Sequence, residues 1–316
     1  MVIHPIRTMV AIFLVSMACN ALAAPAASGP RDRVIMGGST LGLRNSAPQD
    51  IEITFNTALN DLRGNTGTVA NFAVFPTTDA LYAAFDKGEV DGIFGTAIEY
   101  LGREQHLAKE KMALVFKNTA VKQSLVLLAR KDESVGHVKD LRNKRLTLAR
   151  YQDLEEVYLN TLLLRNRLPE ISGFFAARLD AKSPNVAIMD IFFGKTDATI
   201  VRETEYLTAV ELNPQLGNKL VVVERSPPYL PTLGSVRKEL AGERIDNLMR
   251  SLRTIGDTEK GRKVLSFSNA KAIESVTDAD LQSVRDLVHE YQVLKMPKNT
   301  GASVPATRGG AGRNAQ

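Results

Sequence analysis

Eight polar residues stand where the chain leaves an expected strand or enters an expected helix, and their side chains suit a small-ligand site. Most carry hydroxyl groups and two carry guanidinium groups: Ser39, Thr40, Thr78, Thr96, Arg150, Tyr151, Ser183 and Arg202. Hydroxyls and guanidinium groups both donate hydrogen bonds to oxyanions. Open α/β sheets bind ligands beyond the carboxyl ends of their strands, where helix N-termini also point free N–H groups. The set therefore predicts an oxyanion site, with helix capping as the alternative role for Ser39, Thr78 and Ser183, and solvent exposure for Arg202.

Signals for catalysis are weak. The histidines beyond the N-terminal segment, His106, His137 and His289, have no metal-ligand spacing. The sequence contains no Gly-x-Ser-x-Gly elbow, Walker lysine or His-Glu-x-x-His. The run Gly37-Gly38-Ser39-Thr40-Leu41-Gly42 follows an expected strand, but its glycine spacing is wrong for a dinucleotide site. We therefore expect no enzyme activity, no metal and no cofactor, and an exported hydrolase remains the enzyme alternative.

A repeated pattern organises the elements that position these side chains. An apolar helix-like run, Gly-x-x-Asp and a short β-rich run occur once around Gly88 and Asp91, and again around Gly194 and Asp197. Each glycine falls where a helix C-terminus favours a left-handed residue. Two αβ units of one design predict two similar lobes, and both aspartates are expected to be structural turn residues.

The surrounding segments alternate between strand and helix. Expected strands are 33–40, 73–75, 92–94, 124–129, 145–149 and 220–223, and expected helices are 51–62, 77–88, 138–141, 155–164 and one opened by Ser183-Pro184. Pro227, Pro228 and Pro231 interrupt regular structure and mark a crossing. The remainder is expected to be helical, over 243–255, 257–267 and 278–294. The order predicts an α/β fold in which each lobe is a mostly parallel sheet flanked by helices.

The expected domain boundaries follow from this order. Lobe 1 is discontinuous, 33–120 plus 225–294, and lobe 2 is 121–224. Two crossing segments, near Lys117–Val121 and Val223–Pro228, join them and are expected to act as hinges. Residues 296–316 are rich in small and polar residues, which predicts a disordered tail.

The N-terminus has the three parts of a secretory signal peptide over residues 1–23. His4 and Arg7 give a basic start, an apolar stretch ends at Cys19, and Ala21-Leu22-Ala23 is an Ala-x-Ala cleavage site. We expect export with cleavage near Ala23, which removes the single cysteine. Lipid attachment at Cys19 is the alternative, although the preceding residues match a lipoprotein box only faintly.

The composition is globular and excludes some partners. Hydrophobic residues make up 44% of the chain and charged residues 24%. The formal net charge of +5 is mild for 316 residues, and the basic residues are dispersed. This favours anionic ligands weakly and predicts no nucleic-acid binding.

Several motifs occur in one order along most of the chain. They are Gly88-Glu89-Val90-Asp91, Tyr100-Leu101, Leu128-Ala129-Arg130-Lys131-Asp132, Asp140-Leu141-Arg142-Asn143-Lys144-Arg145, Gly194-Lys195-Thr196-Asp197-Ala198, Ser226-Pro227-Pro228 before Val236-Arg237-Lys238, and Gly261-Arg262-Lys263-Val264-Leu265. From Val34 to Val293 the chain resembles periplasmic solute-binding proteins of ABC transporters, in the phosphate, phosphite and phosphonate branch of the type 2 fold. The resemblance implies a receptor that closes two lobes over a small ligand, such as phosphate or a phosphonate-like compound, by hinge motion.

Two departures from the family pattern concern the site. The Ser/Thr-rich anion loop of phosphonate binders is replaced by Arg150-Tyr151-Gln152-Asp153-Leu154-Glu155, and Gly95 stands where an aromatic residue is usual. If an anion binds, Arg150 and Arg202 are expected to replace the hydroxyl loop. The implied partner of this receptor, which we expect to be a monomer, is a membrane permease. In the alternative function, a ligand-sensing module, the partner is a membrane histidine kinase.

Overall fold

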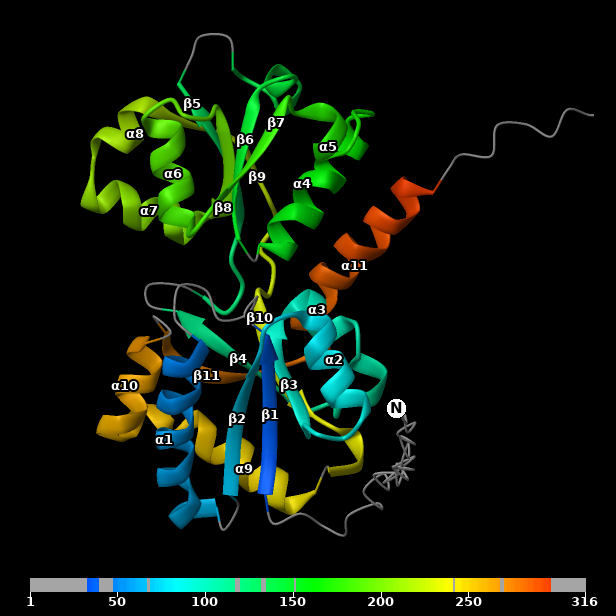
Figure 1. Cartoon of the computed structure of the whole chain (residues 1–316), viewed down its shortest axis with the longest axis vertical. Coiled ribbons are helices and arrows are strands. Elements are labelled where there is room, and N and C mark those ends of the chain that lie inside the picture. The colour runs from blue at the N-terminus through cyan, green and yellow to red at the C-terminus, as the bar shows by residue number, and fades with distance from the viewer. Residues whose placement is uncertain are drawn as a thin grey trace, which may run out of the picture. The chain divides into compact units, whose positions relative to one another are not determined.

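A computed structural model describes residues 33–39, 48–66, 69–116, 120–131, 135–150, 152–240, 242–267 and 270–296. The expected signal peptide and all but the first residue of the expected tail lie outside these residues, as do Thr40, Tyr151 and residues 117–119 of the first expected hinge. Two β-sheets flanked by helices make up the described part (Figure 1). No helix in it has the length and apolar character that a membrane crossing requires.

The first sheet has six strands in the order β11-β4-β10-β3-β1-β2. In chain order they are β1 (Arg33–Ser39), β2 (Val69–Phe75), β3 (Gly92–Thr96), β4 (Lys111–Phe116), β10 (Thr232–Val236) and β11 (Ala270–Val276). Strand β1 lies between β2 and β3 and pairs with both in parallel, whereas β10 joins β3 and β4 antiparallel. We call this sheet and its helices lobe 1.

Helices cover both faces of the first sheet. They are α1 (Pro48–Thr66), α2 (Thr78–Asp86), α3 (Ala97–Leu101), η1 (Glu104–His106), η3 (Lys238–Leu240), α9 (Glu243–Arg253), η4 (Ile255–Asp257) and α10 (Glu259–Phe267). Side chains of a strand alternate between faces, so Val34 packs with Phe72 and Leu248 while Ile35 packs with Leu81 on the opposite side. Figure 1 shows α1 and α10 on one face and α2 on the other.

The second sheet has five strands in the order β7-β6-β8-β5-β9. They are β5 (Leu125–Arg130), β6 (Arg145–Ala149), β7 (Ala177–Ala181), β8 (Ala198–Arg202) and β9 (Leu220–Arg225). The flanking helices are η2 (Val138–Leu141), α4 (Asp153–Arg165), α5 (Ile171–Phe174), α6 (Pro184–Phe192), α7 (Glu203–Leu212) and α8 (Gln215–Lys219). We call this sheet and its helices lobe 2.

The predicted two-lobed α/β class is confirmed, and two details differ. Both sheets combine parallel pairs with antiparallel ones, because β5 runs antiparallel to its neighbours β8 and β9 as β10 does in lobe 1. The region after Pro231 is not wholly helical, since it contributes β10 and β11. These strands complete a sheet begun much earlier in the chain, and local sequence patterns carry little information about such distant pairing.

The two Gly-x-x-Asp units perform the same structural task in each lobe. Gly88 and Gly194 both have φ of +75°, the left-handed region that a side chain disfavours. Asp91 accepts a hydrogen bond from the backbone N of Ile35 in β1 at 2.8 Å. Asp197 accepts one from the backbone N of Arg145 in β6, also at 2.8 Å. Each aspartate thus ties the start of the strand that follows it, β3 or β8, to the backbone of the adjacent strand, β1 or β6.

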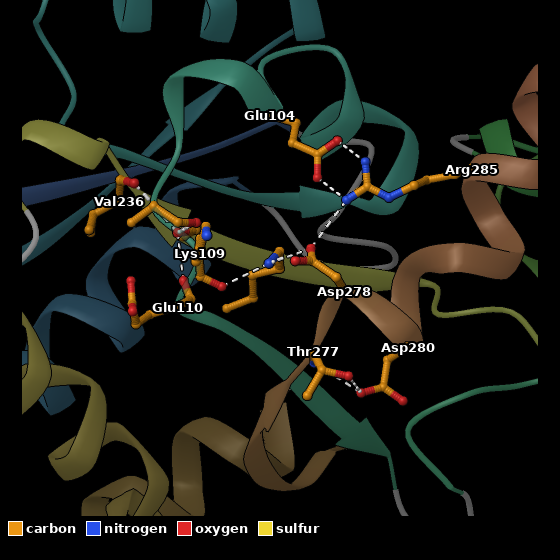
Figure 2. A network of polar contacts seen from close by, with 11 residues as sticks. Glu104, Lys109, Glu110, Val236, Thr277, Asp278, Asp280 and Arg285 are labelled. Atoms are coloured by element: carbon orange, nitrogen blue, oxygen red, sulfur yellow. Dashed lines mark hydrogen bonds and ion pairs between the residues drawn. The ribbon is translucent and has the colours of Figure 1, made fainter.

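The last helix, α11 (Asp278–Lys295), is held to lobe 1 by charged pairs near its N-terminus (Figure 2). Arg285 donates two hydrogen bonds to the carboxylate of Glu104. The buried Lys111 Nζ lies 2.9 Å from Asp278 Oδ1. The hydrogen bond and charge of Lys111 hold the pKa of Asp278 below its ordinary value.

The C-terminal half of α11 contacts lobe 2. Arg165 at the end of α4 donates hydrogen bonds of 2.6 and 2.5 Å to the two carboxylate oxygens of Glu290. Tyr291 Oη donates to Glu170 at 2.5 Å. The buried apolar face of the helix consists of Leu281, Val284 and Leu287. Helix α11 therefore packs against α4 of lobe 2 as well as α3 of lobe 1.

Candidate functional site

Three of the predicted site residues meet around one buried carboxylate in lobe 1. Ser39 Oγ and Thr78 Oγ1 donate to Glu99 Oε1 at 2.5 and 2.7 Å. The backbone N of Thr96 donates to Glu99 Oε2 at 3.0 Å. Glu99 is only 2% exposed. The carboxyl ends of β1 and β3 and the start of α2 are thus joined by one acidic side chain that the sequence analysis did not name.

Local sequence places Glu99 in this position. Thr96 is the N-cap of α3 and Glu99 is its third residue, and together they form a capping box. The Thr-x-x-Glu spacing at 96–99 was the signal that could have revealed Glu99. Gly95 gives the carboxylate room, because a Cβ there would lie 2.3 Å from Glu99 Oε2.

Tyr82 supports the same group from α2. Its hydroxyl donates to the backbone O of Glu99 at 2.6 Å. Burial, with a further contribution from the charge of Glu99, raises the pKa of Tyr82 to about 12. Tyr82 therefore keeps its proton, and this hydrogen bond, at neutral pH.

In lobe 2 the corresponding place is the loop from β6 to α4. Arg150 is exposed, and its backbone N donates to Ala181 O at 2.9 Å. Gln152 is buried, and its Oε1 accepts from the backbone N of Ala149 at 3.0 Å. Asp153, the first residue of α4, accepts a hydrogen bond from Thr96 Oγ1 of lobe 1. This contact joins the two lobes at their strand ends.

The predicted residues Arg202 and Ser183 have structural partners. Arg202 is 5% exposed, and its Nε lies 3.6 Å from Oε1 of the fully buried Glu155. Its charge is therefore matched within lobe 2. Ser183 is the N-cap of α6, and its hydroxyl accepts from the backbone N of Val186 at 3.4 Å.

One further polar residue lies beside this group and was not predicted. Thr232 begins β10, is 3% exposed, and stands directly opposite Thr96 in the antiparallel β10–β3 pair. Directly opposed residues of an antiparallel pair have adjacent side chains on one face of the sheet. Among the described residues, no three or more His, Cys, Asp or Glu side chains are grouped to hold a metal ion.

Comparison with known proteins identifies a family. The sequence model of the family described as ABC transporter, phosphonate, periplasmic substrate-binding protein matches residues 44–281. A search of curated proteins found no match. The comparisons give no support to the sensory-module alternative, and the matched family is a non-enzymatic transport class.

Solved structures share the fold at low sequence identity. A binding protein component of an ABC phosphonate transporter from Pseudomonas aeruginosa has a TM-score of 0.60 and 17% identity, covering 85% of this chain and 90% of the other. PhnD1 from Prochlorococcus marinus, in complex with methylphosphonate, has a TM-score of 0.62 and 14% identity over 83% and 98% of the two chains. A Xanthomonas citri protein bound to chloride ion has a TM-score of 0.65 and 14% identity, with the same coverage. This chain belongs to the family of periplasmic substrate-binding proteins of phosphonate ABC transporters.

Proposed function

We propose that the protein binds its ligand between the two lobes and delivers it to the membrane permease of an ABC transporter. The observation that carries this proposal is the hydrogen bond from Thr96 to Asp153. Thr96 ends β3 of lobe 1, and Asp153 begins α4 just after β6 of lobe 2. Ligands of open α/β sheets bind at such strand ends. A molecule held there contacts both lobes, so its binding favours the closed form.

The ligand we infer is a small oxyanion such as phosphate or a phosphonate-like compound. Arg150, whose side chain is exposed, lies just before the 13-residue helix α4 in the sequence, and the N-terminus of this helix carries a partial positive charge. The lobe 1 hydroxyls of Ser39 and Thr78 already donate to Glu99, and Arg202 lies beside Glu155. The lobe 2 loop is therefore the better candidate for the anion contacts.

A thermal-shift screen of residues 24–316 tests this ligand class. The panel contains phosphate, phosphite, methylphosphonate, sulfate, amino acids and vitamins, and a ligand bound only by the folded form raises the melting temperature. We expect an anion to give a shift that Arg150→Ala reduces, while Arg142→Ala, which removes another exposed lobe 2 guanidinium, leaves the shift unchanged. Shifts with neutral or cationic compounds and none with anions would overturn the oxyanion assignment.

The lobes are proposed to move about the two crossings. Near them, Gln123 and Tyr229 form an antiparallel bridge with backbone hydrogen bonds of 2.8 and 2.9 Å, which keeps the crossing segments together. We propose bodies of 33–120 plus 225–294 and of 121–224, with hinges near Lys117–Val121 and Val223–Pro228. Small-angle scattering is expected to show a smaller radius of gyration with ligand than without it. An unchanged radius with saturating ligand contradicts hinge closure.

Family membership implies a periplasmic location, and we propose the details of export. The signal peptide is cleaved near Ala23, Cys19 is removed, and the mature protein is a monomer. Intact mass of the protein from a periplasmic extract tests cleavage, and a lipid-modified mass on Cys19 would contradict it. Light scattering after size-exclusion chromatography measures the molar mass in solution, and the mass of a dimer would contradict the proposed monomeric state.

A further inference from the structure

Two buried polar atoms at the inter-lobe contact lack hydrogen-bond partners among the described residues. They are Thr232 Oγ1 in lobe 1 and Gln152 Nε2 in lobe 2, in side chains that are 3% and 4% exposed as whole residues. Native proteins pair nearly all such atoms, so each exception calls for an explanation. A ligand that supplies the missing acceptor is one explanation that both atoms share.

The position of Thr232 follows from its strand register. It stands opposite Thr96 in the antiparallel β10–β3 pair, so the two side chains lie on the same face with Cβ atoms about 5 Å apart. Thr96 Oγ1 in turn donates to Asp153 of lobe 2. The hydroxyl of Thr232 therefore lies close to where the two lobes touch.

One atom of the Gln152 side-chain amide, Oε1, is held by a backbone hydrogen bond, and this bond orients the amide. Its Oε1 accepts from the backbone N of Ala149 at the end of β6, and its side chain makes no capping bond to α4. Nε2 is left as a fixed donor beside the first residue of α4, Asp153, which reaches Thr96. Thr232 and Gln152 thus approach the same contact from opposite lobes.

We propose that Gln152 Nε2 and Thr232 Oγ1 donate hydrogen bonds to one oxygen of the ligand. This assignment depends on the proposed function, in which the ligand binds between the lobes. Both donors are neutral, and Thr96, which stands opposite Thr232, is hydrogen-bonded to the carboxylates of Asp153 and Glu99. Against these two negative charges, the described residues of the proposed site have one positive side chain, Arg150. A second negative charge on the ligand is disfavoured in such surroundings. The ligand class is therefore an oxyanion of a single charge, a sulfonate or a phosphonate monoanion.

The ligand-free protein provides the first test. Thr232→Val removes a hydroxyl that has no hydrogen-bond partner among the described residues, so it is expected to leave the melting temperature unchanged or raise it by up to about 4 °C. Thr199→Val is the matched control, because Thr199 Oγ1 is also buried with no partner in the described part of the chain but lies within the lobe 2 sheet. Thr147→Val breaks the 2.8 Å bond to Thr196 and is expected to lower the melting temperature. If Thr232→Val lowers the melting temperature as much as Thr147→Val does, the assignment of Thr232 is overturned.

Ligand binding provides the second test, with methanesulfonate and methylphosphonate as probes at pH 8.5. Methanesulfonate carries one charge, and methylphosphonate carries mostly two at this pH. We expect methanesulfonate to bind at least about tenfold more tightly. Equal or tighter binding of the dianion overturns the charge assignment.

The same probes test the two residues. Gln152→Glu keeps the oxygen that accepts from Ala149 N but replaces the Nε2 donor. Gln152→Glu and Thr232→Val, as separate single variants, are each expected to weaken anion binding about tenfold or more, whereas Thr199→Val is expected to leave it unchanged. Wild-type binding that survives in both variants overturns this assignment alone. Absence of binding by any anion in the wild type overturns the proposed oxyanion function, and this assignment with it.

Discussion

Glu99 is expected to be a structural acceptor that holds the lobe 1 strand ends together. Glu99→Gln places an amide nitrogen where one acceptor oxygen stood. Ser39, Thr78 and the backbone of Thr96 present three donors to the two oxygens. Whichever way the amide turns, at least one of the three donors loses its acceptor. The variant therefore isolates hydrogen bonding from side-chain volume.

The magnitude follows from burial. A buried donor left without an acceptor costs about 1–3 kcal/mol, so Glu99→Gln is expected to lower the free energy of unfolding by about that amount. Glu99→Ala removes the shared acceptor of all three donors and is expected to cost about 3–9 kcal/mol. Whole domains are typically stable by about 5–15 kcal/mol, so the alanine variant is expected to be marginal.

Urea unfolding measures both variants, with the midpoint interpreted only where the denaturant slope is unchanged. Asp86→Asn is the control, because it alters a lobe 1 carboxylate that pairs with Arg103 at the surface. That change is expected to cost less than about 1 kcal/mol. A Glu99→Gln protein within about 0.5 kcal/mol of wild type would refute the structural role of Glu99.

Three further changes have expected outcomes. Gly88→Ala and Gly194→Ala are each expected to cost about 1 kcal/mol in urea unfolding through their φ of +75°, because a Cβ at Gly88 meets none of the described residues and one at Gly194 meets only the flexible end of Arg130; a neutral result at both would contradict the turn argument. Arg165 lowers the pKa of Glu290, so this pair stabilises the fold above about pH 4.3 and loses that effect as pH falls through the folded pKa. Glu290→Gln should therefore reduce the acid dependence of stability, and an unchanged pH profile would exclude that contribution. Arg202→Met removes the guanidinium 3.6 Å from the buried Glu155 carboxylate and is expected to cost about 3–5 kcal/mol, and a smaller loss of stability in calorimetry would show that this ion pair contributes little to the fold.

Much of the fold was predictable because its signals are local. The twin Gly-x-x-Asp units predicted two related lobes, and both glycines have the left-handed backbone that their place after a helix requires. Ser183-Pro184 predicted the start of α6 correctly. Strands β4, β7, β10 and β11 were missed, because sheet pairing rather than a local apolar pattern defines them; β7, for example, exposes four of its five residues.

The candidate site was predictable only in part. Ser39, Thr78 and Thr96 were expected at strand and helix ends, and the structure brings them together around Glu99, while their role as ligand contacts stays a prediction. Their shared hydrogen-bond acceptor was not predictable, because Glu99 comes within hydrogen-bond distance of Ser39 and Thr78 only after the sheet has folded. The roles proposed for Gln152 and Thr232 depend on two side-chain atoms that have no hydrogen-bond partner in the described part of the chain, which no sequence pattern encodes.

The sequence by itself determined the backbone plan of this protein: the twin units, the helix caps and the proline-marked crossing all depend on conformational preferences of neighbouring residues. Tertiary structure decided which polar groups are paired within the protein and which buried polar atoms lack a hydrogen-bond partner among the described residues. Arg202 illustrates the difference, since as a residue type it suits an anion, yet the fold places Glu155 beside it. Hydrogen bonding and charge pairing depend on distances between segments that lie far apart in the chain, and only folding sets those distances.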